Sequence, residues 1–138
     1  MKFIKNWSKE TTTTGEIIYR PMLCLYIQEK YTLGRYYFIV DGGADISLAP
    51  RYVANKIGLD WQSGKKVMMR GISRSKPCEV EGRVHKVEVI VPDIKLKIQI
   101  PICFAIGDAP LLLGREGFFD YFIVTYDKKN KRTFFEQY

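Results

Sequence analysis

The chain has 138 residues, 46% of them apolar, which fits one compact domain with a hydrophobic core of its own. Its apolar runs, such as residues 98–102, are too short to span a bilayer, and residues 1–6 lack the apolar segment of a secretory leader, so we expect a cytoplasmic protein with no membrane partner. The formal net charge of +7 bears on solubility and on encounters with acidic partners, not on the fold.

Three cysteines, Cys24, Cys78 and Cys103, are odd in number and widely spaced. This spacing predicts neither a disulfide framework nor a zinc site, and free, unreactive thiols are expected instead. His85 has no histidine partner in the chain, so the sequence gives no set of metal ligands. We expect neither a metal nor a cofactor.

The N-terminal part of the chain predicts an arm followed by a β-domain. Residues 5–16 are polar and aperiodic, so we expect a loose arm over residues 1–16, from which Phe3, Ile4 and Trp7 can still dock on a domain that spans residues 17–138. The apolar content rises over residues 17–28, which predicts a strand with an edge or a kink at Pro21. A turn over 30–34 then leads into a strand over 35–40.

The rest of the chain alternates turn signals with short apolar runs. Pro50 is well placed to start one short helix that Gly58 ends. The stretch 65–83 contains Gly71, Pro77 and Gly82 and predicts an exposed hairpin. Further strands are expected over residues 84–91, 94–104, 122–127 and 132–136, with a helical turn at 118–122. Many short strands of this kind indicate an all-β domain built as a small closed barrel.

One segment carries a candidate catalytic group. Asp-Gly-Gly-Ala-Asp, residues 41–45, directly follows the apolar strand residues 37–40. The strand fixes the direction of the Asp41 side chain, and glycine allows other backbone to approach it closely. Such an acid can activate water when a second acid faces it. No second Asp-Gly-Gly-Ala occurs in the chain, so the partner carboxylate has to come from a second copy.

Three segments, in order and at similar spacing, resemble the retroviral-type aspartic peptidases, or retropepsins. They are Tyr-Arg-Pro-Met-Leu at 19–23, Phe-Ile-Val-Asp-Gly-Gly-Ala-Asp at 38–45, and Leu-Leu-Gly-Arg at 112–115. The resemblance runs from about residue 17 to the C-terminus and looks closest to cellular, prokaryotic-like members. It implies an all-β, barrel-like acid-protease domain with one or two short helices, a homodimer, and a peptide or unfolded protein as substrate.

The resemblance also implies roles around the turn. Asp41 would be the catalytic aspartate, paired with the partner subunit's Asp41. Gly43 would offer an N–H to the carboxylates and a carbonyl to bound peptide, and Ala44 and Asp45 would line the substrate channel. Asp45 would be held by Arg115 of its own chain and by the partner subunit's Arg20.

Other residues are implied in substrate binding and in the dimer. Gly71 and Ile72 would lie near the tip of a flap that closes over substrate, and Leu112 would form a pocket wall. Gly42, Arg20, Gly114 and Arg115 would support the site and the dimer. The terminal strands would help build a sheet between the two subunits.

Gly42 departs from the pattern, because the family usually has Thr or Ser there. That hydroxyl hydrogen-bonds across the dimer axis, a net contribution of roughly 0.5–1.5 kcal/mol. Two hypotheses therefore stay open: an aspartic endopeptidase, and a weakened dimeric module that binds extended peptide without cutting it. Nucleic-acid binding is not expected, because the basic run at 128–132 is most simply a solvated hairpin turn.

Overall fold

The computed structural model describes residues 1–70 and 79–138. Strands dominate this part of the chain, which contains a single α-helix, α1 (Arg51–Lys56), and short 3-10 turns. The prediction of an all-β domain with one short helix is confirmed. The strands are β1 (Lys2–Asn6), β2 (Ser8–Thr11), β3 (Ile17–Arg20), β4 (Met22–Gln28), β5 (Leu33–Val40), β6 (Ser47–Pro50), β7 (Lys65–Arg70), β8 (Glu79–Val91), β9 (Leu96–Ala105), β10 (Leu112–Leu113), β11 (Phe122–Asp127) and β12 (Arg132–Gln137).

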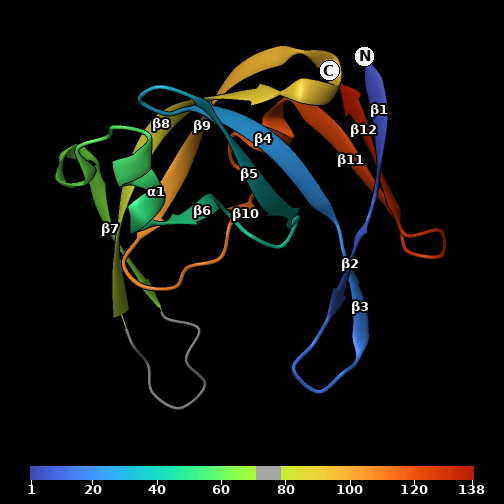
Figure 1. Cartoon of the computed structure of the whole chain (residues 1–138). Coiled ribbons are helices and arrows are strands. Elements are labelled where there is room, and N and C mark those ends of the chain that lie inside the picture. Colours follow the sequence, from blue (N-terminus) through green and yellow to red (C-terminus); the bar gives the residue numbers. More distant parts are fainter. Residues whose placement is uncertain (71–78) are drawn as a thin grey trace.

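A seven-stranded sheet curls into a barrel-like body (Figure 1). Its strand order is β4-β5-β10-β6-β9-β8-β7, and a pairing of Tyr26 in β4 with Ile90 in β8 brings two distant strands of the sheet together. Side chains of β4 alternate between buried and half-buried positions, as expected for a strand with one face on a core. The predicted strands over 35–40, 84–91 and 94–104 are present as β5, β8 and β9.

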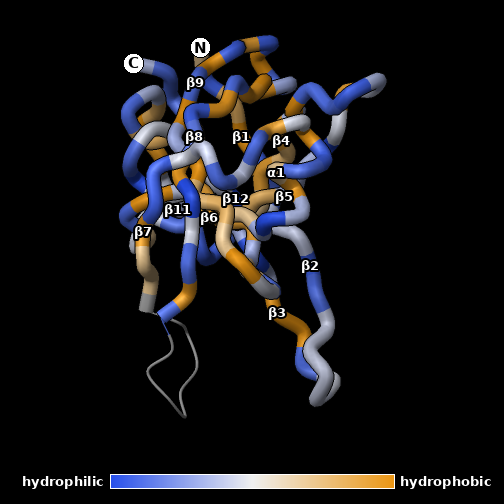
Figure 2. Tube along the Cα trace, turned by 90° about the vertical axis from the view of Figure 1, so that its left-hand side faces the viewer, coloured by the Kyte–Doolittle hydropathy of each residue, from blue (hydrophilic) through white to orange (hydrophobic). Residues whose placement is uncertain are grey.

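The core fills the inside of this body with aliphatic and aromatic side chains. Figure 2 shows the apolar residues concentrated in the strands of the body and the hydrophilic residues in the outer loops. The largest fully buried side chains come from nearly every part of the chain, namely Phe38, Phe104, Phe118, Phe122, Phe135, Leu23, Leu25, Ile100, Ile102, Leu113, Val40 and Val53. Their burial anchors the ends of β5 and β10, where the candidate catalytic turn begins.

The hairpin predicted over 65–83 has its base in β7 and β8, which pair from Lys65 opposite Val84 to Arg70 opposite Glu79.

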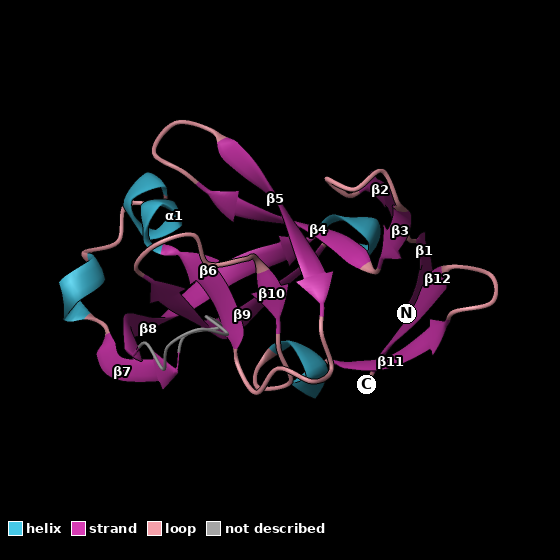
Figure 3. Ribbon diagram, turned by 90° about the horizontal axis from the view of Figure 1, so that it is seen from below, coloured by secondary structure: helices cyan, strands magenta, loops and turns pink. Residues whose placement is uncertain are grey.

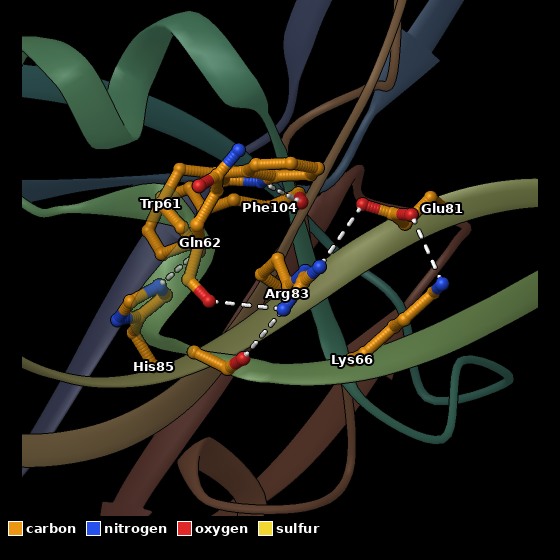
Figure 4. Close-up of polar contacts among 8 residues, drawn as sticks. Trp61, Gln62, Lys66, Glu81, Arg83, His85 and Phe104 are labelled. Carbon is orange, nitrogen blue, oxygen red and sulfur yellow. Dashed lines mark hydrogen bonds and ion pairs between the residues drawn. The ribbon is translucent and has the colours of Figure 1, made fainter.

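A polar cluster joins the base of the β7–β8 hairpin to the body (Figure 4). Arg83 donates from Nη1 to the carbonyl of Gln62 at 2.9 Å, and His85 Nε2 lies 3.0 Å from the carbonyl of Trp61. The indole N–H of Trp61 donates to the Phe104 carbonyl at 2.7 Å. His85 therefore has a backbone partner, and its role is structural.

The prediction of a loose segment over residues 5–16 was wrong. β1 pairs with β12 from Lys2 opposite Glu136 to Asn6 opposite Arg132, and β2 pairs with β3. The β2–β3 hairpin projects away from the body (Figure 1). These strands were not predicted because their composition is polar. In addition, the partner of β1 lies far away in the sequence, and β2 pairs only within a two-stranded ribbon. The predicted boundary between residues 16 and 17 stays a prediction.

Docking of the N-terminal side chains is confirmed in part. The Phe3 ring stacks on Phe135 with 4.7 Å between ring centroids, and Trp7 Nε1 donates to Thr133 Oγ1 at 2.8 Å. Ile4 does not dock, since its side chain is 51% exposed. Pro21 lies between β3 and β4, which belong to different sheets, so the kink predicted there is present.

The two cysteines in the described ranges, Cys24 and Cys103, are free thiols, and Cys78 lies outside those ranges. Burial raises the pKa of both thiols above the ordinary value, which keeps them protonated and weakly nucleophilic near neutral pH. Over residues 1–70 and 79–138, no helix has the length and apolar character that crossing a membrane requires.

Candidate active site

Asp41 stands at the end of β5, where three strands meet. β10 runs parallel to β5, with Leu113 opposite Val40, and antiparallel to β6, with Leu112 opposite Leu48. Figure 3 shows the short β10 lying between β5 and β6. The backbone N–H of Asp41 donates to the Leu113 carbonyl at 2.9 Å, so the pairing continues one residue beyond the strand. The Asp41 backbone is therefore fixed by the barrel.

The turn after Asp41 supports its carboxylate. The Gly43 N–H donates to Asp41 Oδ1 at 2.9 Å, and the Ala44 N–H donates to the Asp41 carbonyl at 3.2 Å. Asp41 is half-buried and Gly43 is exposed, so the carboxylate lies at the surface of a single chain. This arrangement holds one acid in place and leaves it accessible.

The segment that follows β10, residues 114–116, holds the turn through backbone hydrogen bonds. The N–H of Arg115 donates to the Ala44 carbonyl and that of Glu116 to the Asp45 carbonyl, both at 2.9 Å. A Cβ atom on Gly114 would lie 2.4 Å from the carbonyl carbon of Ile46, closer than real Cβ contacts allow. Only glycine fits such an approach of two backbones. The two motifs found in the sequence are therefore in direct contact.

Ser47 is a buried polar residue that the sequence reasoning missed. Its Oγ accepts a hydrogen bond from the Gly114 N–H at 3.0 Å, and its side chain is fully buried. The signal in the sequence was weak: a serine between the apolar residues Ile46 and Leu48. The hydroxyl satisfies a backbone donor that the close approach of Gly114 to Ile46 would otherwise leave without a partner.

Ser47→Ala is expected to lower the free energy of unfolding by about 1–3 kcal/mol, because the buried Gly114 N–H loses its acceptor. Urea unfolding measures this change. Ser63→Ala is the matched control, since Ser63 Oγ donates to the Asp60 carbonyl at 2.7 Å on the exposed surface. We expect the control to change stability by less than about 0.5 kcal/mol. Equal midpoints for the two variants would contradict the role assigned to Ser47.

The structure brings Asp45 and Arg115 together in an ion pair. Both side chains are exposed, 88% for Asp45 and 59% for Arg115, so within one chain this pair contributes only about 0–1 kcal/mol to stability. Arg20 does not reach Asp45 of its own chain. Its Nε instead donates to Glu10 Oε2 at 2.7 Å across the β2–β3 hairpin. Any contact between Arg20 and Asp45 therefore needs a second chain.

The remaining predicted site residues fall into two groups. Leu112 is half-buried in β10 and packs against a small cluster that includes Leu48. Gly71 and Ile72 lie outside the described residues. Within those described ranges, no group of three or more His, Cys, Asp or Glu side chains is arranged to hold a metal ion.

Tyr126 and Phe119 also border the turn, and neither was singled out from the sequence. The Tyr126 hydroxyl donates to the Val40 carbonyl at 2.8 Å, and a Cβ atom on Gly42 would lie 3.7 Å from that hydroxyl and from the Phe119 ring. Burial raises the pKa of Tyr126, and the Asp41 charge raises it further. No local pattern in the sequence points to these contacts.

Comparison with known proteins supports the fold. No protein family and no curated protein matches the sequence. Among solved structures, the crystal structure of a retropepsin-like aspartic protease from Rickettsia conorii is similar, with a TM-score of 0.64 and 16% sequence identity. The match covers 97% of this chain and 98% of that one. The chain therefore has a retropepsin-like fold.

Proposed function

We propose that this protein is an aspartic endopeptidase in which two copies of the chain each contribute one Asp41 to a single active site. The observation that carries the proposal is the Asp41 turn itself. A carboxylate at the end of β5 accepts a hydrogen bond from the Gly43 N–H, and the N–H of Arg115 donates to the Ala44 carbonyl of the same turn, in a chain with a retropepsin-like fold. The sequence contains one Asp-Gly-Gly-Ala segment, and the proposed chemistry needs two acids.

The reason for two acids is the handling of protons. Two carboxylates about 3 Å apart cannot both ionise, so they share one proton. The ionised carboxylate takes a proton from water as the water oxygen attacks the peptide carbonyl. The protonated carboxylate polarises that carbonyl and then returns a proton to the amine that leaves. Cleavage is expected where the pair holds one proton and is lost when both acids ionise.

The substrate-binding residues follow from the same turn. Gly43 is exposed beside Asp41 and presents its carbonyl to an extended peptide, while Ala44, Asp45 and Leu112 line the channel on either side. The β7–β8 hairpin would close over the peptide. The reaction as proposed uses no metal and no cofactor, and we place the protein in the cytoplasm.

The terminal sheet offers a surface for the second copy. A hollow of about 690 Å³ lies over β1, β11 and β12, away from Asp41, and Ile4 and Ile123 contribute to its lining. The Ile4 side chain is 51% exposed and that of Ile123 is 44% exposed. Contact of these apolar side chains with water is unfavourable, so a surface of this kind favours burial against a partner. This exposed apolar surface supports a homodimer in which the second copy covers both residues. The same dimer would place the partner subunit's Arg20 near Asp45.

The second candidate is a dimeric module that binds extended peptide without cutting it. Gly42 favours this candidate, because two successive glycines give the turn unusual backbone freedom directly after the acid. Incubation with a peptide library between about pH 4 and 7, a range around carboxylate titration, separates the two. Cleavage products detected by mass spectrometry support the peptidase. Saturable peptide binding with intact peptide supports the module.

A further inference from the structure

The C-terminal hairpin reaches the candidate catalytic turn through one side chain, Tyr126 of β11. Its hydroxyl donates to the carbonyl of Val40, the residue directly before Asp41, at 2.8 Å. Val40 is only 2% exposed, so water has little access to this carbonyl. Residues 40 and 126 are distant in the sequence, and this hydrogen bond ties the end of β5 to β11.

The same hydroxyl also faces the residue directly after Asp41. A Cβ atom on Gly42 would lie 3.7 Å from the Tyr126 oxygen. Burial raises the pKa of Tyr126 above the usual tyrosine value, and the nearby Asp41 charge raises it further. The hydroxyl therefore stays protonated and donates to the Val40 carbonyl, while its oxygen lies beside Gly42.

We propose that Tyr126 is a positioning residue, which sets the direction of the Asp41 carboxylate by holding the Val40 carbonyl before it and by packing beside Gly42 after it. The turn needs such support, because Gly42 and Gly43 place no Cβ against their surroundings and are free to sample many backbone conformations. One phenol from β11 fixes the Val40 carbonyl and limits the space around Gly42. The consequence for catalysis rests on the proposed peptidase function, whereas the consequence for the backbone does not.

Tyr126→Phe removes the hydroxyl and keeps the ring. Tyr121→Phe is the matched control, since the Tyr121 hydroxyl also donates to a backbone carbonyl, that of Gln99 at 3.4 Å, and Gln99 is not part of the turn. In the Tyr126 variant we expect amide hydrogen exchange at Gly42 and Gly43 to accelerate by about tenfold, because the Val40 carbonyl at the start of the turn loses its hydrogen bond. We expect exchange at these two amides to be unchanged in the control.

Kinetics give the second readout. With a cleaved peptide, Tyr126→Phe is expected to lower kcat by about tenfold and to leave KM within about twofold, since a misdirected acid weakens the chemical step more than peptide binding. Exchange at Gly42 and Gly43 equal to that of the Tyr121 variant would overturn the inference. If the unaltered protein cleaves no peptide, the peptidase proposal fails, and the exchange comparison still decides whether Tyr126 holds the turn.

Discussion

Replacing Asp41 by Asn is expected to lower peptide cleavage by about 10²–10⁴-fold while the fold persists. The amide cannot take a proton from water, so the chemical step loses its base. The amide oxygen can still accept the Gly43 N–H that Asp41 Oδ1 accepts at 2.9 Å, which keeps the turn in place. Initial rates on a peptide from the library, together with a circular dichroism melting curve, measure both parts of this expectation.

Asp120→Asn is the matched control for this variant. Asp120 Oδ2 accepts the Gly117 N–H at 2.9 Å, so it makes the same kind of contact as Asp41 but lies in the 3-10 turn that precedes β11. We expect the control to cleave at a rate within about twofold of the unaltered protein. Undiminished cleavage by Asp41→Asn would show that another group activates the water.

Gly114→Ala is expected to lower the free energy of unfolding by about 3 kcal/mol, at the upper end of the usual cost of overpacking. The added methyl group would meet the Ile46 carbonyl carbon at 2.4 Å and its oxygen at 2.5 Å. Those atoms belong to the backbone that leads into β6. To relieve the clash, the hydrogen-bonded contact between residues 114–116 and the Asp41 turn has to move. Urea unfolding measures the loss of stability.

The control for this effect is Gly42→Ala, used here for stability only. A Cβ atom on Gly42 has its nearest neighbours at 3.7 Å, an ordinary contact distance, and its φ does not lie in the left-handed region. We expect a change of less than about 1 kcal/mol. If both alanine variants unfold at the same urea concentration, the close approach of Gly114 to Ile46 does not constrain the fold.

Much of the barrel was predictable because its strands have a local signature. The apolar run before Asp41, the alternation over 84–91 and the terminal hairpin gave β5, most of β8, and β11 with β12. The first two strands were not predictable in this way. Lys2–Asn6 is mostly polar, and its partner β12 lies at the other end of the chain, so nothing local marks the pairing.

For the same reason, only some residues of the candidate site were predictable from the sequence. Asp41, Gly114 and Arg115 were found because they lie in short motifs, and the structure places the two motifs in contact. Ser47 and Tyr126 were missed, since their hydrogen bonds join residues 67 and 86 positions apart. A serine within an apolar strand or a tyrosine in a hairpin is common in β-proteins, so only the tertiary contact gives either residue its meaning.

Subunit mixing tests most directly the claim that one active site needs Asp41 from two chains. Unaltered and Asp41→Asn chains are unfolded together, refolded at a fixed total concentration in varied proportions, and assayed for peptide cleavage, with Asp120→Asn as the parallel control. Because only dimers of two unaltered chains are complete, we predict that activity follows the square of the unaltered fraction. Activity in direct proportion to that fraction would mean that a single chain carries a whole site, and would contradict the account.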